Sequence, residues 1–585
     1  MMAPEQELTL SIEQIERLFA RLAPRATLTV EPFIKKLFAA CQNSHYLMLT
    51  SDEVAQLQQA TPLVGTPQFP APLILEQNRL YVGRIWFAEQ KIARYLIQRA
   101  KNFRDIDALY AITLLNQLFP QASIQQQQVL LLALRNALLV VSGKPHTGKT
   151  MLAAQLTAWC IAYQAMCHQV ALVALVAPNH QSLYALNQAL NTIRKLPILS
   201  ETARSRLPKE AVTLHQLLYS NASQSYHAEH PLPFDVLIVD EASSLDMEDM
   251  AQLVDALPSY AKLIMLGNPA CLSTEHSTIL TELYHTPVFG TTTQHWLHQI
   301  GLPLISTSKH TIEDRLSDCL VVLEAMPSKT RHTKLTAWCQ AVFNGEQEKV
   351  AKALEEQKGI SCPITWHTIS EPELAQEALN QKAAYFKIAT IGEPEAAFAA
   401  FWDLMLLTTT SRAAYTINAQ QERLLEASGQ KSADWYIGRP VVLCDKNSID
   451  TLFIGDIGLT LPTESGLRVY FPKITGQGYD CFLPTHLPKV TTALAMPYFK
   501  SHTKAINHLW LWLAKDEEEK LDRVSLHGIV SNAQQSLTLF GSNPQILAKI
   551  VAHERPFDRT LHWRLGSHAT SHTKTASAST NQSEA

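Results

Sequence analysis

Short apolar runs separated by helix-like patterns fill the middle of the chain. The runs span residues 138–141, 170–176, 236–239 and 263–266, and helical periodicity follows them. A short apolar run fits a strand that is buried on both faces, and strands that alternate with helices are typical of a parallel α/β sheet. We therefore predict that such a sheet begins after about residue 120.

The N-terminal part of the chain shows a mainly helical pattern instead. Ser11 and Gln14 have the spacing of a capping box. Residues 72–82 alternate as two short strands, and residues 84–96 follow an amphipathic helical pattern. These patterns predict a packed, mostly helical domain.

The last part of the chain mixes both kinds of pattern. Residues 331–432 read mainly as helices, whereas residues 436–490 read as short strands with Gly and Asp turns. Residues 509–514 and 536–540 are predicted strands of a second α/β domain, into which the 436–490 segment inserts as a small β-barrel. Residues 566–585 are rich in Ser, Thr and Ala, and we expect a disordered tail.

Length, charge and cysteine usage narrow the class of protein. A chain of 585 residues is too long to fold around one compact core, so we expect several domains. Its net charge of −4 argues against a protein that coats nucleic acid through a global basic field. A local basic groove stays compatible with that charge. Nine cysteines without a CxxC pair indicate reduced thiols and count against a zinc ribbon or an iron–sulfur cluster. With no signal-peptide pattern and no long apolar window, we expect a cytoplasmic protein without a membrane span.

A glycine-rich stretch follows the first apolar run directly. It fits the pattern GxxxxGK[ST] and consists of Gly143, Lys144, Pro145, His146, Thr147, Gly148, Lys149 and Thr150. Such a loop turns backbone N–H groups and a helix N-terminus toward phosphate oxygens. We predict that Lys149 reaches the β- and γ-phosphates of ATP and that the Thr150 hydroxyl binds Mg²⁺. We assign Gln127 to the same ATP site.

Two acidic residues end the third apolar run. In FDVLIVDEASSLD, Asp240 is predicted to hold Mg²⁺ through water, and Glu241 to orient and deprotonate the attacking water. The alternative is a strand that ends in two acids by chance. A gap of about 90 residues between Lys149 and Asp240 suits a helicase-type motor.

Two other clusters favour structural interpretations. His295 and His298 have i,i+3 metal-ligand spacing, but no third ligand follows them, so a surface or packed pair is the better interpretation. Trp510 and Trp512 alternate like core-facing strand residues, and base stacking is the alternative. We find no nuclease centre in the sequence.

Several motifs resemble those of the RecD family, the alpha subunit of the RecBCD (exonuclease V) complex, which belongs to the superfamily 1 DNA helicases. The resemblance runs in order from about residue 70 to about residue 545. The stretches that carry it are RLYVGRIWFAEQKIARYL (79–96), VTLHQLL (212–218), FDVLIVDEASSLD (234–246), WYIGRPVVL (435–443) and FIGDIGL (453–459).

The resemblance implies an α/β architecture with two RecA-like P-loop NTPase domains, a helical N-terminal domain and a small SH3-like β-barrel insertion. The implied boundaries are 1–115 for the N-terminal partner-docking domain, 116–330 for the first RecA-like domain, 331–435 with 491–565 for the second, 436–490 for the barrel and 566–585 for the tail.

The resemblance also implies function and partners. The family acts as an ATP- and Mg²⁺-dependent motor on the 5′-ended strand of a duplex end, in double-strand break repair and recombination. It works in a heterotrimer with RecB-like and RecC-like subunits, where RecB carries the nuclease, and it holds single-stranded DNA across both RecA-like domains.

Several family positions are changed in this chain. Asn268 replaces an Asp, and Cys271 replaces the Gln that senses the γ-phosphate. Of one DNA-contacting motif only Lys500 and Ser501 remain. Asn532 stands where the family has its arginine finger. Four further positions differ. Ser328 stands where the family has an Arg, His502 with Thr503 replace Gln-Gly, and Gln534 replaces a second Arg.

The lost arginine leaves two functions open. An arginine finger is worth about 10³ to 10⁵ in turnover, which an Asn cannot supply. The chain is therefore either an active motor whose arginine comes from elsewhere, with Arg523 and Arg564 as nearby candidates, or a degenerate nucleotide-binding subunit with a structural and regulatory role.

Overall fold

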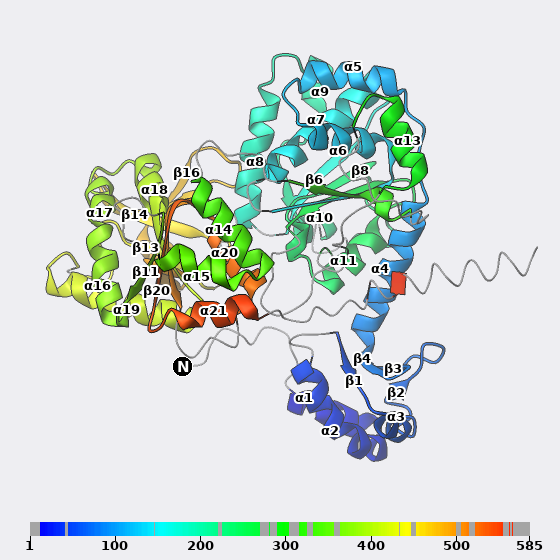
Figure 1. Cartoon of the computed structure of the whole chain (residues 1–585), viewed down its shortest axis with the longest axis horizontal. Coiled ribbons are helices and arrows are strands. Elements are labelled where there is room, and N and C mark those ends of the chain that lie inside the picture. The colour runs from blue at the N-terminus through cyan, green and yellow to red at the C-terminus, as the bar shows by residue number, and fades with distance from the viewer. Residues whose placement is uncertain are drawn as a thin grey trace, which may run out of the picture.

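The computed structural model describes residues 12–40, 45–144, 147–178, 180–219, 225–268, 280, 283, 289–303, 315–324, 332–355, 363–431, 433–445, 452–498, 505–513, 521–553, 561, 564 and 565. Figure 1 shows three bodies: an N-terminal one, a central one joined to it by the long helix α4 (Gly83–Ala100), and a third one beside the central body. Among the described residues, no helix is both long enough and apolar enough to cross a membrane.

The N-terminal body combines three helices with a small sheet. The helices are α1 (Ile12–Leu22), α2 (Pro24–Ala40) and α3 (Ser51–Leu57). The sheet has the order β1 (Tyr46–Met48), β4 (Arg79–Val82), β3 (Leu73–Glu76), β2 (Val64–Gly65). The two strands predicted within 72–82 form a hairpin whose turn holds Gln77 at φ 56°. Ser11 of the predicted capping box lies outside the described residues.

The central body contains the predicted parallel sheet. Its strand order is β10 (Leu320–Leu323), β5 (Leu138–Gly143), β9 (Lys262–Gly267), β8 (Val236–Val239), β6 (Val173–Ala177), β7 (Val212–Thr213), and all pairings are parallel. The four predicted apolar runs correspond to β5, β6, β8 and β9, which confirms that prediction.

Helices cover both faces of this sheet, as the apolar strands require. Leu139 and Val141 pack on one face and Leu138 and Val140 on the other, because successive strand side chains point to opposite sides. The first face carries α5 (Ala108–Leu118), α6 (Ile124–Arg135), α7 (Lys149–Met166), α8 (His180–Arg194) and α9 (Glu201–Arg206). The second face carries α4, α10 (Leu214–Leu218) and α11 (Met247–Ala256). Beside the sheet lies α13 (Thr291–Gln299), whose Trp296 packs against the first cluster.

A second parallel sheet forms the third body. Its order is β11 (Ile364–Thr368), β20 (Ala533–Gly541), β19 (Ile506–Leu513), β12 (Leu404–Thr408), β18 (Ala495–Pro497). The strands predicted at 509–514 and 536–540 correspond to β19 and β20. Reading residues 331–432 as mainly helical missed β11 and β12. Helix α18 ends at Asp403 and β12 begins at Leu404 with no loop between them, so the change of period was hidden.

The helices of the third body flank this sheet. They are α14 (Thr333–Asn344), α15 (Gln347–Glu355), α16 (Glu371–Gln381), α17 (Ala383–Ala389), α18 (Pro394–Asp403), α19 (Ser411–Ala427), α20 (Arg523–Val530) and α21 (Gln545–Ala552).

The predicted barrel insertion is an antiparallel sheet. Its order is β16 (Tyr479–Phe482), β15 (Gly466–Pro472), β14 (Ile457–Thr463), β13 (Pro440–Leu443), β17 (Val490–Thr492). In the described strands the pairings run from edge to edge without closing a barrel. The loop between β15 and β16 reaches the central body, where Asn187 of α8 donates to the Ile474 carbonyl at 2.7 Å and Asn191 donates to the Thr475 carbonyl at 2.9 Å.

Candidate nucleotide site

The predicted phosphate loop joins the end of β5 to the start of α7. The strand ends at Gly143 and the helix begins at Lys149, which is the strand–loop–helix order that the motif predicts. Gly148 has φ 81°, a backbone conformation that side chains other than glycine rarely adopt. A Cβ atom on Gly143 would lie 2.7 Å from the Thr147 hydroxyl oxygen, so the loop folds back on itself too tightly for another residue there. Pro145 and His146 lie outside the described residues.

Lys149 is buried within this loop. Its Nζ donates to the carbonyl oxygens of Gly143 at 2.8 Å and Lys144 at 2.9 Å. These carbonyls hold the ammonium group at the N-terminus of α7, where the positive end of the helix dipole also favours an anion. Nucleotide phosphates would therefore meet a preplaced cation.

Asp240 follows β8 at the same carboxyl edge of the sheet. Its side chain is 0% exposed, and neither carboxylate oxygen makes a hydrogen bond of good geometry with the described residues. Burial and the neighbouring Glu241 charge raise the pKa of Asp240 to about 7, against the opposing effects of Thr150 and Lys149. A buried carboxylate that has no hydrogen bond of good geometry among the described residues, beside a hydroxyl, offers the oxygen ligands that Mg²⁺ prefers. Thr150 and Asp240 therefore fit the metal that the sequence predicts.

Glu241 has an unusual backbone conformation. Its φ of 51° lies in the left-handed region, which costs a non-glycine residue about 1–3 kcal/mol. The 3-10 turn η1 (Ala242–Ser244) follows, and Ser244 holds the Glu241 carbonyl oxygen through its backbone N–H at 3.0 Å and its hydroxyl at 2.9 Å. Strain of this kind persists where the surrounding structure fixes a side chain for a task.

The third body contacts the phosphate loop through α14. The Lys144 ammonium donates to Gln340 Oε1 and lies 5.0 Å from the centre of the Phe343 ring. Burial lowers the pKa of Lys144. No sequence motif marked Gln340 or Phe343, because a contact between distant segments leaves no local pattern.

The structure places Asn532, at the position of the family's arginine, inside the third body. Asn532 is buried, and its Nδ2 donates to the Gly528 carbonyl at 3.4 Å. Arg564 cannot supply the missing charge, because it is buried against Glu76 and Glu89 of the N-terminal region. Arg523 begins α20 next to Gly345, at the end of α14 whose Gln340 and Phe343 meet the loop.

Other predicted residues stand apart from this arrangement. Gln127 directs its side-chain amide to the Ala122 carbonyl at 3.0 Å, whereas the amide nitrogen of Gln126 lies 3.9 Å from the Cβ position of Gly148. The backbone N–H of Asn268 donates to the Ser243 hydroxyl. Six further predicted positions fall outside the described residues, namely Cys271, Ser328, Lys500, Ser501, His502 and Thr503. Within the described chain no group of three His, Cys, Asp or Glu side chains could hold a metal, and His295 and His298 are both exposed on α13.

Comparison with known proteins agrees with this picture. A family model described as an AAA domain matches residues 125–274. The RecBCD enzyme subunit RecD of Haemophilus influenzae is 25% identical over 516 residues, covering 80% of this chain and 78% of that protein. RecD of Mycolicibacterium smegmatis is 25% identical over 510 residues, covering 84% and 82%.

Solved structures of Pif1 helicases also match. Pif1 from Bacteroides in complex with ADP-AlF3 and single-stranded DNA is 13% identical, with a TM-score of 0.36 over 71% of this chain and 90% of that one. Pif1 from Candida albicans is also 13% identical, with a TM-score of 0.36 over 74% and 97%.

The parallel sheets, the phosphate loop and the match to an AAA domain define a protein of the P-loop class. Within that class the chain resembles RecD proteins along most of its length, as its sequence motifs predicted.

Proposed function

We propose that this chain is the RecD-type subunit of a RecBCD-like complex, an ATP-dependent helicase motor on the 5′-ended strand in double-strand break repair and recombination. The observation that carries the proposal is the cluster at the carboxyl edge of the first sheet. There a buried Lys149 in the phosphate loop faces the same edge as Asp240, whose carboxylate oxygens make no hydrogen bond of good geometry with the described residues. Similarity to RecD proteins over 80% of the chain supports the choice of complex.

The roles of the residues follow from their positions. The phosphate loop holds the β- and γ-phosphates by its N–H groups, and Lys149 exchanges its two carbonyl partners for phosphate oxygens. Thr150 and Asp240 would hold Mg²⁺, which when bound neutralises charge on the phosphates. Glu241 orients a water for in-line attack on the γ-phosphate and accepts its proton.

The contact between Lys144 and Gln340 couples this site to the second RecA-like domain. A phosphate that draws Lys144 away from Gln340 and Phe343 changes how α14 meets the loop. Repeated making and breaking of the contact between Lys144 and Gln340 moves the two domains along single-stranded DNA. The N-terminal body docks on a RecC-like subunit, and a RecB-like subunit carries the nuclease.

Asn532 favours a second function in which the chain holds nucleotide without turnover. A buried Asn bonded to Gly528 cannot stabilise charge on a transferring phosphate. In that case the chain is a structural and regulatory subunit of the same complex.

The deciding experiment measures DNA-stimulated ATP hydrolysis on this chain alone and on the complex with RecB-like and RecC-like subunits, with the phosphate loop of the partner motor disabled. For an active motor, Lys149→Gln lowers hydrolysis by about 10² or more, whereas Lys387→Gln, at an exposed lysine of α17, leaves it unchanged. If neither wild type nor Lys149→Gln hydrolyses ATP while wild type still binds it, the motor is rejected and the chain is the nucleotide-holding subunit.

A further inference from the structure

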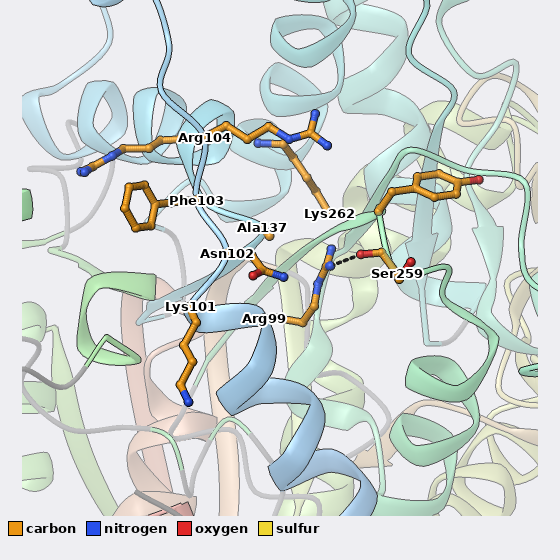
Figure 2. Close-up of a pocket in the computed structure, with 10 residues that line it drawn as sticks. Arg99, Lys101, Asn102, Phe103, Arg104, Ala137, Ser259 and Lys262 are labelled. Atoms are coloured by element: carbon orange, nitrogen blue, oxygen red, sulfur yellow. Dashed lines mark hydrogen bonds between the residues drawn. The ribbon is translucent and has the colours of Figure 1, made fainter. Parts of the chain in front are cut away.

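A pocket of about 280 Å³ lies at the amino edge of the first parallel sheet (Figure 2). The end of α4, the end of α6 and the turn before β9 line it. Strand β5 begins beside the pocket at Leu138 and ends in the phosphate loop at Gly143. Six residues at about 3.3 Å each separate the two places by roughly 17–20 Å. The pocket is therefore distinct from the nucleotide site.

Five cationic side chains line this pocket, namely Arg99, Lys101, Arg104, Arg135 and Lys262. No carboxylate is among its lining residues, and none of the five cations has an ion pair within 4.0 Å among the residues that the structure describes. Burial lowers the pKa of Arg135, and the charges of Asp318 and Asp105 oppose this shift while that of Arg315 adds to it.

Two of the five cations serve the fold. Lys262 donates to the carbonyl oxygens of Ala133, Leu134 and Asn136 at the end of α6, where a cation complements the helix dipole. Arg135 lies over the rings of Phe103 at 5.1 Å and Trp296 at 4.7 Å.

Of the remaining three cations, Arg99 also has an aromatic neighbour, the Tyr95 ring, whose centre lies 5.9 Å from its guanidinium carbon. Arg99 is only 5% exposed; its Nη1 donates to the Ser259 carbonyl, but its Nε and Nη2 groups find no acceptor of good geometry in the described chain (Figure 2). A buried donor without an acceptor is costly, so an acceptor from outside the chain would satisfy it. Lys101 and Arg104 are exposed at the rim.

The charges in the pocket also act on one another. Burial lowers the pKa of Lys262 to about 8, and the positive charges of Arg104 and Arg99 act in the same direction. An anion placed among these side chains would relieve that repulsion. Guanidinium groups bind the tetrahedral oxygens of a phosphate with paired N–H donors, which is the geometry that Arg99 leaves free.

We propose that this pocket binds a phosphate group, which Arg99 contacts directly and Lys101 and Arg104 attract. Its source is the backbone of a single-stranded nucleic acid. Tyr260 lines the same pocket and is 54% exposed as a residue, so its ring can stack on a base next to the bound phosphate. The choice of a strand as the source rests on the proposed function, whereas the phosphate chemistry does not.

The test compares variants of the full chain with two probes. The first probe is a fluorescein-labelled dT20, whose affinity is measured by anisotropy over a series of salt concentrations. The second is inorganic pyrophosphate, measured by the rise in the thermal unfolding midpoint. The pocket variant is Lys101→Gln/Arg104→Gln, which changes exposed residues and so keeps the fold. Its charge-matched control is Arg17→Gln/Arg21→Gln on exposed positions of α1.

The pocket variant should bind dT20 about tenfold more weakly. The slope of the logarithm of its binding constant against the logarithm of salt concentration should be smaller by about 1.4, because each phosphate contact on a single strand contributes about 0.7. It should also lose part of the stabilisation by pyrophosphate, and the control variant should lose neither. The phosphate loop contributes equally to all variants and cancels. Tyr260→Ala should weaken dT20 binding but leave the effect of pyrophosphate unchanged.

The remaining outcomes separate the claims. If the pocket variant loses the stabilisation by pyrophosphate but binds dT20 as wild type does, the pocket binds a free phosphate compound. The backbone of a single strand is then not the source of the phosphate. If the pocket variant keeps both the dT20 affinity and the stabilisation by pyrophosphate of wild type, the proposed phosphate site is wrong. If wild type fails to bind dT20, the proposed function fails, and the pyrophosphate comparison still decides whether the pocket binds phosphate.

Discussion

Arg564 donates from Nε to Glu89 Oε2 at 2.7 Å, although 475 positions separate the two residues in the chain. Its Nη1 lies 2.7 Å from Glu76 Oε2, and the rings of Tyr81 and Trp86 lie beside the guanidinium group. Arg564 is 1% exposed and Glu89 is 0% exposed. The last described segment of the chain therefore ties α4 and the N-terminal hairpin together.

Arg564→Met should lower the free energy of unfolding of the N-terminal region by about 3–5 kcal/mol, because it leaves the buried Glu89 without its cation. Hydrogen exchange over residues 73–96 measures the effect locally. Arg84 supplies a control on the same helix, since its 3.0 Å pair with Glu248 is exposed and Arg84→Met should change stability by less than about 1 kcal/mol. Equal effects of both changes would contradict the structure.

Asn532→Arg should not restore rapid ATP hydrolysis. The Asn532 side chain is buried against Gly528, and its backbone carbonyl accepts from Ile506 at the start of β19, so an arginine there would bury a charge within the third body. We expect a thermal midpoint lower than that of the Asn532→Ala control, and turnover unchanged from wild type. A tenfold gain in turnover with an intact fold would show that the position still faces the phosphates.

Lys382 should make stability depend on pH. It is buried, with its Nζ 4.5 Å from the centre of the Phe401 ring, and burial lowers the pKa of Lys382 to about 7. Between pH 7 and the ordinary lysine pKa of 10.5, the unfolded chain binds a proton that the folded chain does not, so stability rises with pH. Below pH 7 both states are protonated, and the folded state carries the full cost.

Lys382→Met should remove this dependence. The variant should exceed wild type by roughly 2–5 kcal/mol at pH 6, and the difference should vanish near pH 10. Urea unfolding at several pH values, followed by the fluorescence of the neighbouring tryptophans, measures the difference. A constant difference across that range would show that Lys382 keeps its proton in the folded state.

Gly476 offers a test of the contact between the inserted sheet and α8. It has φ 77°, and a Cβ atom there would lie 2.7 Å from the backbone nitrogen of Gln188. Gly478 has φ 76° with no atom within 4 Å of its Cβ position, so Gly478→Ala carries the same backbone strain without the collision. Gly476→Ala should increase hydrogen exchange in α8 and in the β15–β16 loop well beyond Gly478→Ala. Similar exchange in both variants would show that the loop does not dock on α8 in solution.

The sequence alone was enough to predict the parts that depend on local pattern. The apolar runs 138–141 and 236–239 became buried strands, and GxxxxGK[ST] became a turn between strand and helix, because burial on both faces and glycine conformation are encoded within a few residues. The order of the motifs also identified the relatives. Strand β12 was not predicted because it follows helix α18 directly, with no loop to mark the change from helix to strand.

Tertiary structure decided which distant charges meet. Arg564 and Arg523 were equal candidates for the lost arginine by position in the sequence, yet only the fold shows that Arg564 is held by Glu89. The contact of Lys144 with Gln340 and the convergence of Arg99, Arg104 and Lys262 are likewise products of the fold. Such contacts join separate elements whose relative placement depends on the packing of the whole core, and no local period of the sequence records them.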